Sequence, residues 1–108
     1  MQTSVSGRND EDKNSPKYFG SWSWNHLPVQ PREPISEQEA KKRKAYYVAH
    51  YDAQRLICFE KYLDGQLDRA IRYTYWDDGK VRDRVIRQAD GSEMIDLFDR
   101  NGKRSNPG

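Results

Sequence analysis

The sequence has one cysteine and two histidines, the residue types that bind structural zinc or pair a nucleophile with a base: Cys58, His26 and His50. On neighbouring strands of one hairpin, His50 and Cys58 would pair a base with a nucleophile, which suggests an enzyme or a small-ligand site. However, a lone cysteine in an apolar run is typical of a small buried side chain, and no glycine-rich oxyanion loop follows Cys58. We therefore predict no catalytic residues and no enzyme, and keep this pair as a third functional hypothesis.

The sequence offers few ligands for a metal. A structural zinc site needs four cysteine or histidine ligands, and the chain has one cysteine and two histidines. Aspartates are numerous, but most lie at predicted turns, where the carboxylate bonds to nearby backbone. A hydrolase with paired carboxylates also needs a cleft, and we expect a thin sheet without a deep cavity. We predict no metal and no cofactor.

The composition predicts one small domain with an aromatic core. The chain has 108 residues, of which 34% are hydrophobic, 33% charged and 12% aromatic. A chain of this length has room for one core, and the aromatic side chains must supply most of its buried area. No apolar run is long enough to cross a bilayer, no signal peptide is visible, and the single cysteine suits a reducing compartment. We expect a cytoplasmic protein that does not contact a membrane.

Positive charge is concentrated in one short segment. Residues 17–44 carry six basic and three acidic side chains, whereas residues 45–108 carry eleven of each. The basic excess lies at 41–44, which is a small patch for nucleic-acid binding. A second basic group lies on predicted strands near Tyr73 and Trp76, and would support single-stranded nucleic acid if it lined one sheet face: Arg69, Arg72, Arg82, Arg84 and Arg87. Nucleic-acid binding is the second functional hypothesis.

The N-terminal part predicts a tail followed by a strand. Residues 1–16 are polar and nearly free of large apolar groups, so we expect a disordered tail. Residues 18–24 then alternate with period two, as a strand does. The alternation places the aromatic side chains of Tyr18, Trp22 and Trp24 on one face, and Phe19, Ser21 and Ser23 on the other.

A proline-rich segment and a short helix come next. Prolines recur every third residue at 28, 31 and 34, which is the repeat of polyproline II, so we expect an extended segment crossing the surface. Ser36 and Glu39 have the spacing of a capping box, with Ile35 able to contact Ala40. Acidic side chains at the start and basic ones at the end complement the helix dipole. These signals predict a helix near 37–44.

The C-terminal two-thirds has the rhythm of a β-meander. Turn signals recur at intervals of 11 to 14 residues, starting at 52, 64, 78, 90 and 101, and four of them are Asp-Gly or Asn-Gly. The runs between them predict strands at 45–51, 56–63, 67–76, 81–89 and 93–98. We predict a mainly β protein: one antiparallel meander of five to six strands with a short helix, forming a single domain over residues 17–108.

The unit Tyr73-Thr-Tyr-Trp-Asp-Asp-Gly-Lys-Val81 resembles the strand-turn unit of YD-type and MORN-variant repeat proteins. Weaker copies surround Asp52, Asp64 and Asn101. Proteins with MORN-variant repeats include antitoxin-like and immunity-like bacterial proteins. The resemblance implies an antiparallel architecture and no catalytic residues, because the glycines of the repeat serve turn geometry.

These observations favour a protein-binding module over an enzyme. We predict that it docks one protein partner through the edges and a face of its sheet, as an immunity or antitoxin-type inhibitor does. A homodimer formed through an edge strand is equally compatible. Tyr18, Trp22 and Trp24 have two interpretations: a lid over the apolar face of the sheet, which we favour, or exposed anchors for a partner. The candidate partner-binding residues are two tryptophans and four basic side chains: Trp22, Trp24, Lys41, Arg43, Arg82 and Arg84.

Overall fold

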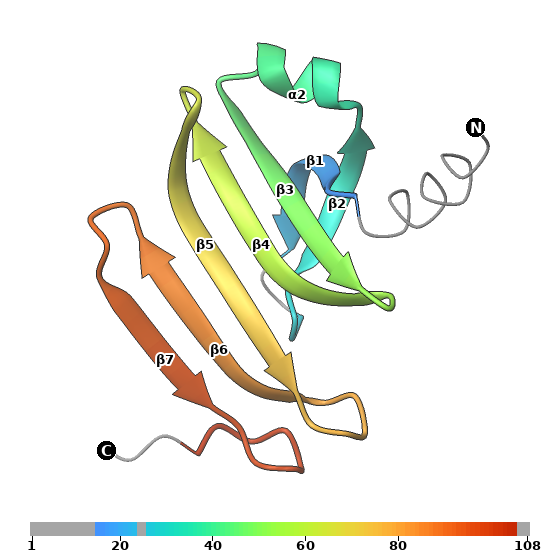
Figure 1. Cartoon of the computed structure of the whole chain (residues 1–108), viewed down its shortest axis with the longest axis vertical. Helices are drawn as coiled ribbons and strands as arrows, with labels where there is room; N and C mark the ends of the chain where they lie inside the picture. Colours follow the sequence, from blue (N-terminus) through green and yellow to red (C-terminus); the bar gives the residue numbers. More distant parts are fainter. Residues whose placement is uncertain (1–14, 24–25, 106–108) are drawn as a thin grey trace, which may run out of the picture.

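The computed structural model describes residues 15–23 and 26–105. These residues form seven strands and one short helix (Figure 1). The predicted disordered tail over 1–16 lies outside the described residues except for Ser15 and Pro16, and Trp24 also lies outside them. No helix in the described part of the chain is long and apolar enough to cross a membrane. In chain order the elements are β1 (Lys17–Ser23), β2 (Gln30–Ile35), α2 (Glu37–Lys42), β3 (Ala45–Asp52), β4 (Arg55–Leu63), β5 (Gln66–Tyr75), β6 (Val81–Gln88) and β7 (Glu93–Leu97).

All seven strands belong to one antiparallel sheet with the order β2-β1-β3-β4-β5-β6-β7. The prediction of a mainly β, antiparallel fold is confirmed, but the predicted count of five to six strands is wrong. The additional strand is β2, which we expected to be a polyproline II segment. Polyproline II and β backbones have similar dihedral angles, and an edge strand tolerates proline because its outer side needs no donor. Pro31 therefore pairs with Trp22 of β1, and Pro34 pairs with Phe19.

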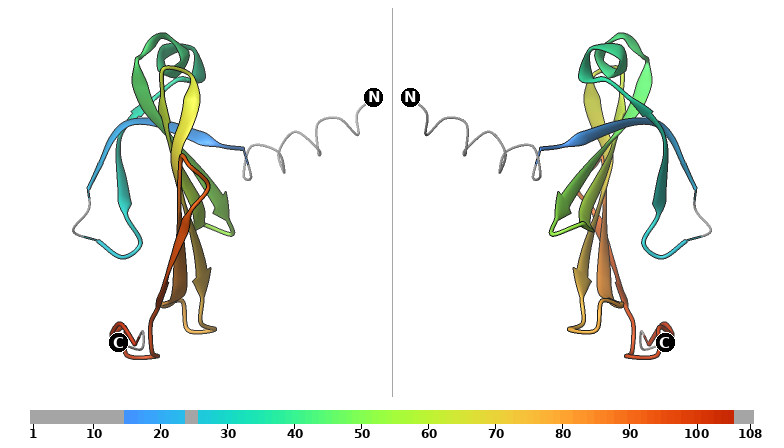
Figure 2. Two further views of the ribbon diagram at one scale, coloured as in Figure 1. Left: turned by 90° about the vertical axis from the view of Figure 1, so that its left-hand side faces the viewer. Right: turned by 90° about the vertical axis from the view of Figure 1, so that its right-hand side faces the viewer.

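Three register shifts bend the sheet. One shift lies between each of the strand pairs β3–β4, β4–β5 and β5–β6. At each shift one residue is skipped in the pairing of the strands: Ile57, Asp68 and Arg82. A bulge of this kind increases the local twist and bends the strand. Figure 2 shows the outcome: the β1–β2 hairpin lies across one side of the sheet, while no described strand or helix lies over the other side of β4–β7. We call these sides the covered face and the open face.

The core lies between the covered face and the β1–β2 hairpin. Phe59 and Ile71 are each 1% exposed, and Tyr73 is 2% exposed. Trp22 reaches over from β1 and stacks on Phe59, with ring centroids 5.1 Å apart. The backbone N–H of Val29 donates to the phenol oxygen of Tyr73 at 3.0 Å, inside the core. Aromatic side chains therefore supply most of the buried area, as the composition requires.

The strict alternation predicted for the first strand is wrong. Phe19 and Trp22 both pack against the main core, whereas Tyr18 packs against a second cluster around Tyr46. The strand therefore changes its inward-facing side between Phe19 and Trp22. Gly20 lies at this position, and a Cβ there would be 2.5 Å from a guanidinium nitrogen of Arg43. Glycine permits both the turn of the strand and this close approach.

The helix begins as predicted and ends early. The Ser36 hydroxyl accepts the backbone N–H of Glu39 at 3.0 Å, which is half of a capping box. The Glu39 carboxylate does not complete the box, because it accepts a hydrogen bond from Arg43 at 3.2 Å. Arg43 is the C-terminal cap in an extended conformation, so the helix stops at Lys42 and not at residue 44. Ala40 is fully buried and ties the helix to the second cluster.

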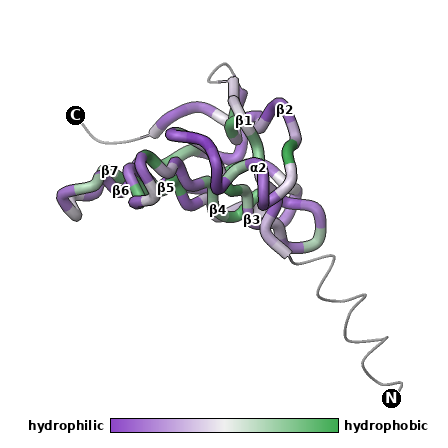
Figure 3. Tube along the Cα trace, turned by 90° about the horizontal axis from the view of Figure 1, so that it is seen from above, coloured by the Kyte–Doolittle hydropathy of each residue, from purple (hydrophilic) through white to green (hydrophobic). Residues whose placement is uncertain are grey.

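The sheet itself is one layer thick. Seen from above, β3–β7 form a narrow band in which hydrophilic and hydrophobic residues alternate, with the β1–β2 hairpin standing off one side (Figure 3). At its β3 end the sheet buries side chains on both sides, because Tyr46 and Val48 of the second cluster share the side of His50 and Cys58. Beyond this cluster, on β4–β7, only the side that faces the hairpin is covered.

Candidate functional site

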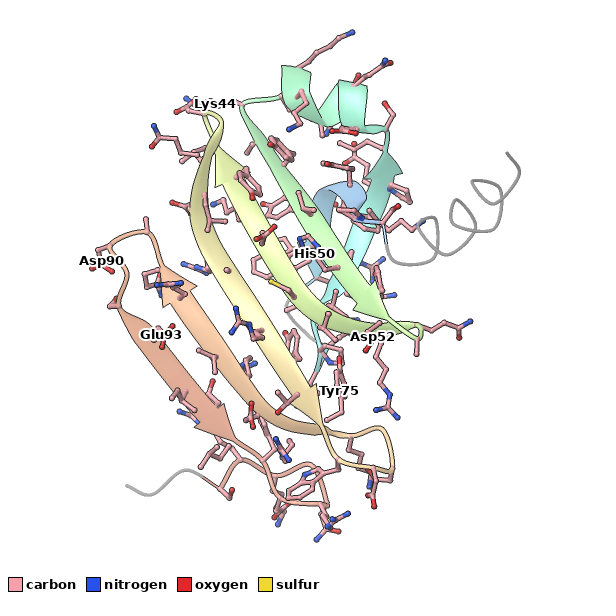
Figure 4. All side chains as sticks on the ribbon, in the orientation of Figure 1. Lys44, His50, Asp52, Tyr75, Asp90 and Glu93 are labelled. Carbon is pink, nitrogen blue, oxygen red and sulfur yellow. The ribbon has the colours of Figure 1, made fainter. Side chains whose placement is uncertain are left out.

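One row of side chains crosses five strands on the open face. In register from β3 to β7, the row consists of His50, Cys58, Arg72, Val85 and Ile95. Residues paired directly across antiparallel strands point to the same side of the sheet, so these side chains are neighbours. Figure 4 shows the imidazole of His50 on the side of the sheet that faces the viewer, opposite the hairpin. The predicted placement of His50 beside Cys58 is confirmed.

The middle of this row forms a shallow pocket of about 390 Å³. The imidazole Nε2 of His50 lies 2.8 Å from a carboxylate oxygen of Glu60, two residues along β4 from Cys58. The Tyr62 hydroxyl donates to the same carboxylate oxygen at 3.4 Å. The pocket is lined by His50, Ile57, Cys58, Glu60, Arg72 and Tyr73.

The electrostatics of this pocket favour a protonated thiol. Burial raises the pKa of the Cys58 thiol, and the negative charge of Glu60 raises it further, while Arg72 lowers it by a smaller amount. A cysteine nucleophile needs the opposite arrangement, with a lowered pKa and a base directed at the sulfur. The imidazole of His50 is instead held by Glu60. The pocket is therefore better suited to recognition than to cysteine chemistry.

Alkylation of Cys58 is expected to be slow. At pH 7.5 iodoacetamide should react with the folded protein about tenfold more slowly than with the same protein in guanidinium chloride, because the raised pKa leaves less thiolate. Glu60→Gln removes a charge that raises this pKa and should speed the reaction, whereas Arg72→Gln should slow it. Rates measured against pH by mass spectrometry test this. A folded protein that reacts faster than the unfolded chain would contradict it.

The hairpin creates a second hollow that the sequence did not predict. An open cleft of about 500 Å³ lies between the segment that leads into β2 and the β3–β4 hairpin. The sequence predicts that the N-terminal strand covers the apolar face of the sheet, but it does not predict a hollow between the two. The packing of β1 and β2 on the covered face adds a second wall, which is a tertiary effect.

The predicted partner-binding residues do not form one surface. Trp22 is half-buried and stacks in the core, so it is not an exposed anchor. Lys41 is exposed on α2, and Arg43 pairs with Glu33 at 3.0 Å and with Glu39 at 3.2 Å. Trp24 lies outside the described residues.

The two remaining predicted residues lie on β6, far from α2 (Figure 1). Arg82 lies against Asp83 at 3.5 Å and over the ring of Trp76 at 5.9 Å. Arg84 donates two hydrogen bonds to the buried carboxylate of Asp96, at 2.9 and 2.7 Å. Arg84 is therefore part of a structural ion pair.

The predicted basic face for single-stranded nucleic acid is not present. Arg72 lies on the open face, whereas Arg84 pairs with Tyr73 and lies on the covered face with it. Tyr73 is only 2% exposed, so it cannot stack on a base. Alternation along β5 and β6 sends neighbouring arginines to opposite sides of the sheet.

Sequence reasoning named His50, Cys58 and Arg72 but missed the other open-face residues. Glu60 lies beside Cys58, and three exposed aliphatic side chains lie on or beside this face: Ile57, Ile95 and Leu97. Because side chains alternate between the two faces of a sheet, the sequence can place Glu60 on the same face as Cys58, two residues away on one strand. This reasoning fails across a register shift, where one extra residue reverses which side chains face which side.

Comparison with known proteins gives a family and no activity. A family model described as "Family of unknown function (DUF6156)" matches residues 11–107. No curated protein and no solved structure matches the chain. The family description mentions neither YD-type nor MORN-variant repeats. Any functional argument must therefore rest on the geometry of the chain.

Proposed function

The chain belongs to DUF6156, a family of unknown function, and from its geometry we propose that it is a non-enzymatic protein-binding module that docks one protein partner on the open face of its sheet. No described strand or helix overlies the open face on β4–β7, and this face combines exposed apolar side chains with two exposed arginines, Arg72 and Arg87. These are the features of a recognition surface.

One observation carries the proposal: exposed aliphatic side chains lie on or beside the same face of the sheet as Arg72. Ile57 is 38% exposed, Ile95 is 53% exposed and Leu97 is 43% exposed. Large apolar side chains grouped on one face favour association, because burying them removes apolar area from water. Arg72 is exposed and no described carboxylate lies within ion-pair distance of it. The partner that fits this face has an apolar patch beside an acidic side chain.

The face is a better docking surface than the edges. The outer strand β2 contains Pro31 and Pro34, which have no backbone N–H to offer a partner strand. At the other edge the N–H of Ser105 donates to the carbonyl of Leu97 at 2.7 Å, so part of β7 is already paired. Docking by strand addition, including a homodimer formed in this way, gains less support than docking on the face.

More specifically, we propose that the module inhibits its protein partner, as immunity and antitoxin proteins do. An inhibitor of another protein needs a pre-organised surface and no chemistry of its own. The protonated thiol of Cys58 and the engaged imidazole of His50 support a recognition role for the pocket in the middle of the face. The resemblance to MORN-variant proteins points in the same direction.

Affinity capture with matched variants tests the docking face. The wild-type protein, Arg72→Glu and Lys41→Glu are each used to capture proteins from a lysate of the source organism. We expect one protein to be retained by the wild type and by Lys41→Glu, and its retention to fall at least about tenfold with Arg72→Glu, because a reversed charge opposes an acidic partner. Both substitutions are at exposed positions, and circular dichroism checks that each variant is folded.

Two results would contradict the proposal. Equal retention of the captured protein by Arg72→Glu and by the wild type would place the interaction elsewhere. Loss of all captured material after nuclease treatment would favour nucleic-acid binding through the basic segment at 41–44. Sedimentation of the purified protein adds a third measurement, since a dimer abolished by Arg72→Glu would identify a second copy as the partner.

A further inference from the structure

The cleft behind the sheet has the size and lining of a small-molecule site. Its volume of about 500 Å³ lies within the range of ligand pockets. One wall comes from the segment that leads into β2, and the other from the β3–β4 and β5–β6 hairpins. Its walls are mainly apolar and aromatic, with a few polar groups: His26, Pro28, Val29, Gln30, Pro31, Tyr51, Gln54, Arg55, Leu56, Tyr75 and Gly79.

Hydrogen bonds to two phenols fix the walls of this cleft. The N–H of Val29 donates to the hydroxyl oxygen of Tyr73, which holds the first wall to the sheet. The hydroxyl of Tyr75 donates to the carbonyl of Leu56, which joins the two hairpins of the other wall. Burial raises the pKa of Tyr75 to about 12, so this donor keeps its proton at neutral pH. The cleft is therefore formed before any ligand enters, which lowers the cost of binding.

The charged groups that line the cleft are basic. Arg55 contributes a guanidinium and His26 an imidazole, and no described lining residue carries a carboxylate. The guanidinium of Arg55 lies over the ring of Tyr75, with its carbon 5.4 Å from the ring centroid. A cation beside flat aromatic and proline surfaces suits a ligand that has an anionic group on a flat apolar body.

The turn that carries these groups is strained. Ala53 and Gln54 have φ angles of 51° and 70°, a left-handed conformation that is unfavourable for a residue with a Cβ. The corresponding β4–β5 turn uses Asp64 and Gly65, and glycine accepts this conformation readily. Strain of this kind is found where the surroundings hold a group in position for function. In this protein the turn leads directly into Arg55 at the cleft.

We propose that this cleft binds a small aromatic carboxylate or a close anionic analogue, with the anionic group at Arg55 and the flat body against Tyr51, Tyr75 and the prolines. The site is distinct from the open face, because it lies on the hairpin side of the sheet. Figure 4 shows Asp52 and Tyr75 at the same end of the sheet, where the two hairpins that line the cleft meet. Asp52 is the last residue of β3 and does not line the cleft.

Titration with benzoate and benzamide tests this proposal. The two probes share a ring and differ in charge, and binding is followed in the amide NMR spectrum of the full chain. We expect benzoate to cause saturable shifts at Arg55, Leu56 and Gly79, and benzamide to bind at least about fivefold more weakly. Arg55→Gln should remove the preference for benzoate, whereas Arg72→Gln, on the opposite face, should leave it unchanged.

Three outcomes would overturn the proposal. Benzoate that produces no saturable shifts would show that the cleft does not take this class of molecule. Equal affinity for benzoate and benzamide would show that Arg55 does not recognise the anion. A preference lost in Arg72→Gln but retained in Arg55→Gln would place the anion site on the open face. None of these outcomes depends on whether a protein docks there.

Discussion

Replacing Phe59 with alanine is expected to lower the free energy of unfolding by about 4 kcal/mol. Phe59 is 1% exposed, and its ring forms a three-ring cluster with those of Trp22 and Tyr47, at centroid distances of 5.1 Å and 5.6 Å. The substitution removes apolar burial, leaves a cavity and releases the hairpin that covers the sheet. Small domains are stable by about 5–15 kcal/mol, so this loss is a large share of the total.

Urea unfolding followed by tryptophan fluorescence measures this effect, with Ile57→Ala as the control. Ile57 lies on the same strand but is 38% exposed, so its truncation should cost less than about 1 kcal/mol. In Phe59→Ala the emission of the folded state should also move to longer wavelength, because Trp22 loses its stacking partner. Similar losses of stability in the two variants would mean that the core is not centred on Phe59.

The contrast between the two faces also decides how the functional tests can be read. Side chains on the covered face hold the hairpin, so their substitution changes stability first. Exposed positions such as Arg72 and Lys41 can be changed at little cost in stability. A loss of binding in an exposed variant therefore reports on recognition and not on unfolding.

Much of the sheet was predictable because its signals are local. The predicted strands after residue 44 differ from the observed ones by no more than one residue at either end. Asp-Gly and Asn-Gly turns depend on the backbone freedom of a few residues, and the Ser36 cap depends on one hydroxyl and one N–H. Local preferences of this kind hold in almost any tertiary fold, so the sequence alone predicts the turns and the helix cap.

The candidate sites were not predictable, because they depend on contacts between distant segments. The register shifts at Ile57, Asp68 and Arg82 reverse strand parity, and no residue type marks them in advance. The change of inward-facing side in β1 near Gly20 brings Trp22 into the core, at a position where the side chain of Arg43, 23 residues later, lies close to the backbone. The cleft then forms between the segment that leads into β2 and the sheet. Only the placement of His50 beside Cys58 followed from a single hairpin.

Removal of the carboxylate of Asp96 is the second substitution with a large expected effect. Asp96 is the most buried charged residue described, at 2% exposure, and Arg84 donates to one of its oxygens from two nitrogens. Its other oxygen lies 2.9 Å from Arg104, an ion pair whose geometry is not that of a hydrogen bond. The side chain of Arg104 is 60% exposed, so water screens this second contact. The pairing with Arg84 therefore carries most of the stabilisation.

Asp96→Ala is expected to lower the free energy of unfolding by about 3 kcal/mol, because it leaves the half-buried cation of Arg84 without its partner. Glu93→Ala is the control on the same strand: its carboxylate is exposed, lies 3.9 Å from Arg87, and should contribute less than about 0.5 kcal/mol. The double variant Asp96→Ala with Arg84→Ala should lose less than the sum of the single losses, since neither charge is then left alone. If the losses in free energy of unfolding measured in urea are additive, the two charges are not coupled. Asp96 would then stabilise the fold through its packing alone.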